Sequence, residues 1–174
     1  MCSFFCSKQI YQKSPAIPKV NNSLSGVYIY FKLGNKMTLA YLTEALKNAA
    51  KAEKNVNYVN DGDIYTLNSL PDIDYSVVFL TQNNHSVNEN FVDFGYTIFY
   101  VDRLTDNQDN KLKIQSDGIQ HIINILNRFS YDEDVDVMYP VSFQPFSQRF
   151  ADDCSGVYAS IKIRVDQSNG ICEF

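Results

Sequence analysis

The sequence predicts an α+β domain in which an antiparallel sheet packs against two helices. Two segments carry apolar residues at helical spacing, and four others are rich in β-branched and aromatic residues. Strands and helices do not alternate regularly, as they would in a parallel β-α-β sheet. An antiparallel sheet covered by both helices is therefore the simplest arrangement that buries the two helical stripes.

The length of 174 residues fits one domain, because such a chain buries roughly 70% of its unfolded surface around a single core. We expect an extended arm at 1–36, the α+β domain at 37–166 and a short tail at 167–174. The arm has two early prolines and a polar run but no sustained periodicity. Its run GVYIYFKL at 26–33 predicts a short strand.

The first helix is predicted over Thr38 to Lys54. Threonine is one of the residue types that favour the N-cap position, so Thr38 marks the start. Apolar residues then recur at helical spacing, while charged residues take the opposite side. The stripe expected to face the core is Leu39, Leu42, Leu46, Ala49 and Ala50.

Three β segments are expected between the two helices. The pair Asp61-Gly62 predicts a small hairpin across Val59–Leu67. The runs Asp74–Thr81 and Phe91–Leu104 form an antiparallel pair, with the polar stretch between them as a loop. Both faces of the longer run are partly apolar, which predicts a strand covered by a helix on one face and by a neighbouring subunit on the other.

The second helix is expected at Leu112–Phe129, with a buried stripe of Ile119, Ile122, Ile123, Leu126 and Phe129. An acidic turn, YDEDVDV, follows at 131–137. The run Val137–Phe146 contains two prolines, which fit a strand at a sheet edge. The last strand, Gly156–Val165, alternates apolar and polar residues, so one face belongs to the core and the other is exposed. Gly156 is expected to permit a sharp entry into it.

Charge and composition argue against several classes of protein. A net charge of -5 and a pI near 4.9 disfavour a domain that grips nucleic acid by its phosphates, which needs a basic surface. The four cysteines have no framework spacing, so a reducing compartment, the cytoplasm in which the chain is made, is expected. No run approaches the ~18 apolar residues of a membrane span, and the N-terminus lacks a secretory signal.

Cys154 follows two aspartates and is a candidate nucleophile. A Cys–His pair needs His85 or His121, the only histidines, and nothing in their spacing brings either one to Cys154. The competing interpretation is a small buried residue that enters the last strand, and it is favoured.

Two patterns resemble metal sites weakly. Cys2 and Cys6 lie four residues apart and need distant ligands to hold zinc. Asp132, Asp134 and Asp136 alternate as at the start of a calcium loop, but the sixth and twelfth positions are Val and Phe instead of Gly and Glu. An ordinary acidic surface is the favoured interpretation, so no metal or cofactor is expected.

Two stretches resemble bacteriophage neck or tail-completion proteins of the tail-terminator-like superfamily, particularly those of crAss-like phages. They are DNKLKIQSDGIQHIINILNRF at Asp109–Phe129 and PFSQRFADDCSGVYASIKI at Pro145–Ile163. The order helix, strand pair, helix, strand pair is also similar over Met37–Val165. Met1–Lys36 has no counterpart in the smallest members of the superfamily.

This resemblance implies a structural virion protein without catalytic residues. Six or twelve identical subunits would close a ring at the head–tail junction, between the portal or an adjacent neck ring and the tail protein. Genomic DNA would pass through the ring without specific binding. The resemblance makes the following acidic residues candidates for the lumen or rim: Asp132, Glu133, Asp134 and Asp136. In the arm, the candidates for contacts between rings are Phe4, Phe5, Ile10 and Tyr11.

Two alternatives stay open. One is a soluble, non-catalytic adaptor or binding module with the same sandwich, which works as a monomer or dimer. The other is a small cysteine-dependent hydrolase that uses Cys154. Particle size separates the first from a ring, and a Cys154→Ala variant separates the second.

Overall fold

The computed structural model describes residues 37–63, 65, 73–133, 135–147 and 153–166. The predicted arm at 1–36, with Phe4, Phe5, Ile10, Tyr11 and the expected strand at 26–33, lies outside these residues. So does the predicted tail at 167–174.

The fold is α+β, and the described residues form a seven-stranded mixed sheet with two helices packed on it. Helix α1 spans Leu39–Lys51 and ends three residues before the predicted end. Its N-cap is Thr38, as predicted, because the Thr38 hydroxyl accepts a hydrogen bond of 3.2 Å from the backbone N–H of Tyr41. The core side of α1 carries Leu42, Leu46, Ala49 and Ala50, all buried.

Helix α2 spans Lys111–Glu133 and is longer than predicted. The acidic stretch after Phe129 continues the helix for another turn, since it contains no glycine or proline to end it. The predicted turn at 131–137 is therefore wrong for 131–133, which are helical, and for Asp136–Val137, which form strand β5. The hydroxyl of Tyr41 in α1 donates a hydrogen bond to Glu133, which ties this last turn to the first helix.

The buried face of α2 is also rotated from the predicted stripe. Ile119 and Ile123 are each 36% exposed, so the prediction that they face the core is wrong. Gly118 faces the sheet instead, and a Cβ there would lie 2.7 Å from the Tyr100 ring. The glycine lets the helix approach the sheet closely, and this contact fixes the rotation of α2. The buried apolar residues of α2 are Ile114, Ile122, Ile125, Leu126 and Phe129.

Two long strands form the centre of the sheet. Strands β4 (Phe91–Arg103) and β7 (Cys154–Asp166) pair antiparallel along their whole length. Strand β2 (Val77–Gln82) pairs antiparallel with β4, which confirms the predicted strand pair, and the two-residue β3 (Ser86–Val87) continues along the same edge of β4.

Strand β1 (Tyr58–Asp61) occupies one outer position and pairs with β2 in parallel. The described residues of β1 therefore do not form the hairpin that was expected at Asp61-Gly62. The sheet is mixed, whereas an antiparallel sheet was predicted. A parallel neighbour needs a crossover, and residues 62–76 are long enough to provide it. The Asp61-Gly62 pair is a signal for a tight turn and gives no information about a long connection.

Two short strands share the other edge of β7. Strand β5 (Asp136–Val137) pairs with its end, and β6 (Ser142–Ser147) pairs with its first half. The chain between β5 and β6 contains Pro140, and Pro145 lies inside β6. Both prolines are thus at an edge, as predicted, where a missing N–H costs no central hydrogen bond.

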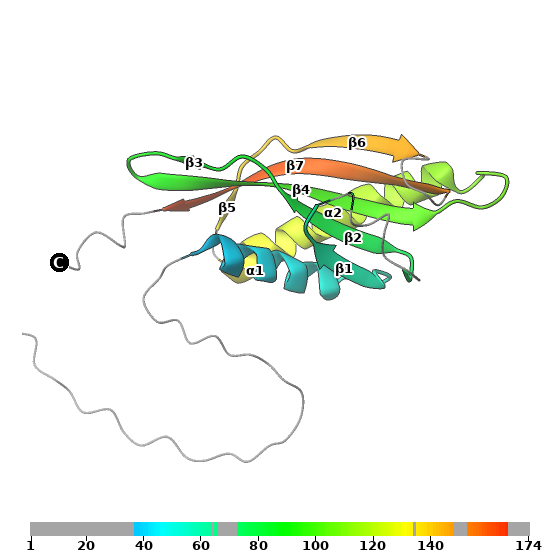
Figure 1. The fold of residues 1–174 in the computed structure, drawn as a ribbon, viewed down its shortest axis with the longest axis horizontal. Helices are drawn as coiled ribbons and strands as arrows, with labels where there is room; N and C mark the ends of the chain where they lie inside the picture. The colour runs from blue at the N-terminus through cyan, green and yellow to red at the C-terminus, as the bar shows by residue number, and fades with distance from the viewer. Residues whose placement is uncertain (1–36, 64, 66–72, 134, 148–152, 167–174) are drawn as a thin grey trace, which may run out of the picture. The chain divides into compact units, whose positions relative to one another are not determined.

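Both helices lie on the same side of the sheet (Figure 1). The main core fills the space between them and includes Tyr96, Ile98 and Tyr100 of β4. The opposite face carries a second, smaller apolar cluster, in which Phe99 and Val101 are 8% and 0% exposed within the single chain. This part of the sheet needs no neighbouring subunit to cover it, in contrast with the prediction.

Candidate functional site

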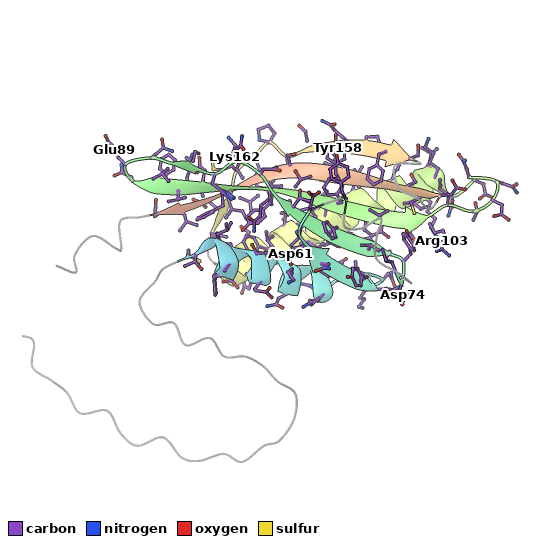
Figure 2. The ribbon with its side chains drawn as sticks, viewed as in Figure 1. Asp61, Asp74, Glu89, Arg103, Tyr158 and Lys162 are labelled. Carbon is purple, nitrogen blue, oxygen red and sulfur yellow. The ribbon has the colours of Figure 1, made fainter. Side chains whose placement is uncertain are left out.

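The second face of the sheet changes from apolar to polar along its length. Figure 2 shows Arg103 and Asp74 at one end of the sheet and Glu89 at the other, with Lys162 on the side of Glu89. On the polar side, a hollow of about 780 Å³ lies over β4, between the β2–β3 connection and β7. We call it the polar hollow; its lining residues are Gln82, Asn83, Asn84, His85, Ser86, Gly95, Ser160, Ile161 and Lys162.

Gly95 allows the β2–β3 connection to pass close over β4. A Cβ atom at Gly95 would lie 2.6 Å from the backbone oxygen of Asn84, closer than real Cβ contacts. The backbone N–H of Asn83 donates to the Gly95 oxygen at 2.9 Å, which holds the connection down. The glycine therefore shapes one wall of the polar hollow.

A short ladder of polar side chains crosses the sheet beside the hollow. The Asn83 amide donates to the Thr97 hydroxyl at 2.8 Å, and that hydroxyl lies 3.2 Å from the hydroxyl of Ser160. The three residues come from the β2–β3 connection, β4 and β7. Because Thr97 is 7% exposed and its hydroxyl is satisfied, the ladder fixes the positions of the exposed Asn83 and Ser160 side chains.

An ion pair lies across β4 and β7 near the same end. Asp93 and Arg164 face each other in register, and Arg164 donates two hydrogen bonds, of 2.7 and 2.9 Å, to the two oxygens of Asp93. The guanidinium carbon is 3.7 Å from the centre of the Phe91 ring. Hydrogen bonding to Arg164 holds the pKa of Asp93 below its ordinary 3.8, against the opposite effect of burial.

We expect Asp93 to make the stability of the protein sensitive to acid. A carboxyl whose pKa is lowered by folding stabilises the folded state above its unfolded pKa, and that contribution disappears as the pH falls below about 4. Asp93→Asn should therefore lose less unfolding free energy than the wild type between pH 7 and pH 3, in urea titrations at both pH values. Glu89→Gln, an exposed carboxylate in the β3–β4 connection, is the control. Equal losses in Asp93→Asn and wild type would contradict a role for the pair.

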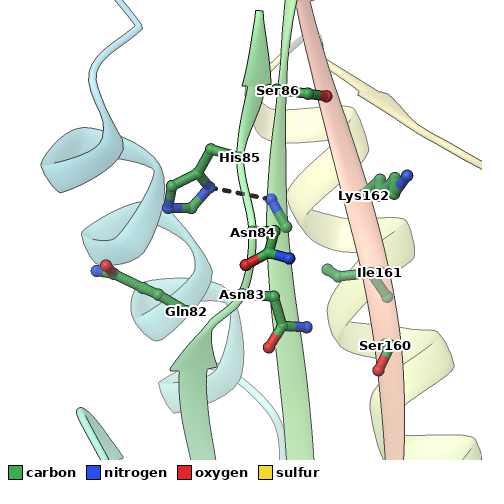
Figure 3. Close-up of a pocket in the computed structure, with 9 residues that line it drawn as sticks. Gln82, Asn83, Asn84, His85, Ser86, Ser160, Ile161 and Lys162 are labelled. Carbon is green, nitrogen blue, oxygen red and sulfur yellow. Dashed lines mark hydrogen bonds between the residues drawn. The ribbon is translucent and has the colours of Figure 1, made fainter.

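His85 lies at the hollow but turns its ring toward the side of α1, away from Ser160 and Lys162 (Figure 3). Its Nδ1 accepts a hydrogen bond of 3.2 Å from the backbone N–H of Gly95. Nδ1 therefore acts as an acceptor here, and His85 clamps the β2–β3 connection onto β4.

The structure does not bring Cys154 together with either histidine. Cys154 is 0% exposed and belongs to the apolar cluster on the second face. His121 stacks on Tyr100, on the helix-covered face, at a ring distance of 5.1 Å. His85 contacts Gly95, which is eight residues along β4 from the partner of Cys154, about 26 Å at the rise of a strand. Cys154 is the small buried strand residue that the favoured interpretation expected.

A second polar cluster joins the two helices. Glu53, just after α1, accepts hydrogen bonds of 3.0 Å from Nδ1 of His121 and 2.9 Å from the Asn124 amide. Burial acts to raise the pKa of Glu53, but these hydrogen bonds and the charges of His121 and Arg128 outweigh it and lower the pKa. The cluster fixes α1 against α2. Asn124 and Arg128 are polar residues of α2 that face α1 and are only partly exposed.

The predicted lumen or rim residues fall into different elements. Glu133 is in the last turn of α2 and accepts a hydrogen bond from Tyr41; this bond, with burial and the negative charge, raises the pKa of Tyr41 to about 12. Asp136 is exposed in β5, opposite Arg164. Asp134 and the side chain of Asp132 lie outside the described residues. Of the predicted residues that are described with their side chains, Glu133 therefore lies at a helix end and Asp136 in a strand.

No group of three or more metal-binding side chains occurs among the described residues. Cys2 and Cys6 are outside them. None of the helices in the described ranges has the length and apolarity to cross a membrane.

The polar hollow offers amide, hydroxyl and ammonium groups, with Asp93 already paired to Arg164. It is suited to bind a polar surface by hydrogen bonds. The hollow was not predicted from the sequence, although two signals point to it: a glycine inside the long strand β4, and a charged residue in each of the paired strands β4 and β7.

No protein-family model matches the chain, and no curated protein matches its sequence.

Proposed function

We propose that the protein is a structural subunit of a ring at a phage head–tail junction, where it joins the portal or an adjacent neck ring to the tail and surrounds the channel for DNA. The observation that carries this proposal is the pair of open sheet edges. Among the described residues, β1 pairs only with β2, and β5 and β6 pair only with β7. These two edges differ in sequence and lie at opposite sides of the sheet.

Two different open edges support a head-to-tail contact. An edge strand has unpaired N–H and C=O groups that a neighbouring chain can satisfy. When the contacting surfaces of the two copies differ, repetition of the contact closes a ring if the rotation fits. The acidic balance of the chain is compatible with this role, since a channel that attracted phosphates would retain DNA.

A non-catalytic binding module is the second candidate function, and the polar hollow favours it. The hollow is open, and its amide and hydroxyl side chains are held in place by the ladder from Asn83 to Ser160. Such a surface binds a polar partner without any assembly of identical copies.

Light scattering of the purified full-length chain separates the two functions. A ring of six chains of 19.9 kDa has a mass of about 120 kDa, and one of twelve about 240 kDa. We expect one of these masses at high protein concentration. A mass of one or two chains throughout the concentration series, with no larger species when the portal and tail proteins are added, would favour the binding module.

A further inference from the structure

An apolar stripe runs along the flank of α2 that faces away from α1. Leu112, Ile119 and Ile123 are 78%, 36% and 36% exposed, and intervals of seven and four residues place them on one line of the helix. The residues that contact Glu53 beside α1, His121 and Asn124, lie on the opposite flank.

This stripe is next to the open edge of the sheet. Gln115, one turn before Ile119, donates hydrogen bonds of 3.4 Å to the backbone oxygen of Phe146 in β6 and 3.3 Å to the Ser155 hydroxyl in β7. The outer edge of β6 and the stripe therefore form one surface, with backbone groups on one side and apolar side chains on the other. Pro145 removes one donor from this edge, so the apolar stripe must supply more of the binding energy.

We propose that the strand-forming segment Gly26–Leu33 of a second copy docks on this surface, beside β6 and against the stripe Leu112, Ile119 and Ile123. The segment alternates apolar side chains at 27, 29, 31 and 33 with tyrosine and lysine, so as a strand it presents one apolar face. That face matches the stripe, and the backbone of the segment matches the open edge.

The charge of the chain supports the same occupant. Residues 1–36 contain five lysines and no acidic residue, so residues 37–174 carry all 20 acidic residues and the other ten basic ones. The basic arm at 1–36, which contains the segment, is therefore attracted to the acidic domain of a neighbouring copy, and two acidic domains repel each other without it.

The length of the connection favours a second copy over the same chain. Only residues 34–38 separate Leu33 from Leu39 at the start of α1, and these six steps span at most about 22 Å. Helix α1 contacts the flank of α2 that is opposite the stripe, and a helix with side chains is about 10–12 Å across. In the same chain, the connection would have to pass around α2 almost fully extended.

This inference deepens the proposed ring and rests on it. Each copy donates one segment and accepts one, which is a head-to-tail contact. The acceptor surface is distinct from the polar hollow, which leaves the hollow available to other partners.

Photo-crosslinking of the full-length chain tests the position of the segment. Benzoylphenylalanine replaces Phe31, which lies on the apolar face of the segment, and an equal mixture of ¹⁴N-labelled and ¹⁵N-labelled chains is irradiated and mapped by mass spectrometry. We expect crosslinks to residues 111–123 and 142–147, with mixed-isotope pairs among them. Crosslinks confined to single chains, or to other parts of the domain, would overturn the proposal.

Two variants test the interaction itself. Ile119→Asp places a charge in the stripe, and Ile29→Pro breaks the donor strand; each should lower the yield of crosslinks between chains at least about tenfold, because an unpaired charge or a lost strand costs more than a factor of ten in affinity. Asn48→Asp, an exposed position on α1, changes the charge equally and should keep the wild-type yield. Circular dichroism checks that each variant folds. An unchanged yield in Ile119→Asp would overturn the proposal.

Mixing the variants separates this inference from the ring. Ile29→Pro still accepts a segment and Ile119→Asp still donates one, so the mixture should form a single dimer of about 40 kDa. If the wild type forms rings but crosslinks elsewhere, the docking surface is wrong and the ring stands. If the crosslinks are as expected but only open chains or dimers form, the docking surface stands and the ring is wrong.

Discussion

Gly156→Ala should lower the free energy of unfolding by about 3 kcal/mol, as measured by urea unfolding with circular dichroism. A Cβ atom at this position would lie 2.0 Å from the backbone oxygen of Tyr100 and 2.8 Å from Cζ of Phe146. Backbone cannot move aside by changing a rotamer, so relief requires β7 to separate from β4. These two strands pair along their entire length at the centre of the sheet, which makes the separation costly.

Gly118→Ala is the matched control. Its Cβ would meet side-chain atoms of Tyr100 and Val157 at 2.7 Å, and side chains can shift. Alanine also favours the helix over glycine by about 1 kcal/mol, which offsets part of the crowding. We expect a clearly smaller loss than for Gly156→Ala. A larger loss of unfolding free energy for Gly118→Ala than for Gly156→Ala would contradict the close approach of β4 and β7 at Gly156.

Phe129→Ala should cost about 3–5 kcal/mol of unfolding free energy in the same assay. Phe129 is 1% exposed and packs in the main core between the helices and the sheet. Its removal leaves a cavity that the surrounding strands cannot close, because the long pairing of β4 and β7 holds them in place.

Ile123→Ala is the control for the rotation of α2. Ile123 is 36% exposed, so truncation should cost under about 1 kcal/mol. The stripe predicted from the sequence would bury Ile123 and give a loss of about 2–5 kcal/mol. Equal losses for Phe129→Ala and Ile123→Ala would contradict the observed rotation.

Local signals predicted much of the fold. The cap at Thr38, the stripe of α1 and the alternation of β7 each depend on neighbouring residues, so sequence periodicity could identify them. The α+β class followed from the number and order of these elements.

Features that depend on distant contacts could not be predicted in this way. The rotation of α2 is set by the contact of Gly118 with Tyr100, and the parallel pairing of β1 brings Tyr58 beside Val77, far along the chain. The helix continues to Glu133 because nothing in the acidic stretch stops it and Tyr41 of α1 binds its last turn. From the sequence, the closely spaced acidic residues at 131–137 had suggested a turn.

The candidate site was hidden for a similar reason. Asp93 and Arg164 are 71 residues apart, and only the register of β4 with β7 places them opposite each other. Cys154, which has the most reactive side chain type in the chain, is instead buried on the face opposite His121. Its position between the aspartates and the last strand reflects packing.

The proposed role at a phage head–tail junction is tested most directly by electron cryo-microscopy of virus particles whose genome carries the gene for this chain. We predict density for the α+β domain in six or twelve copies around the DNA channel, at the junction between portal and tail. Two results would contradict the proposed function. One is a particle that carries the gene but has no density for this fold at the neck. The other is a particle that stays complete and infectious when the gene is deleted.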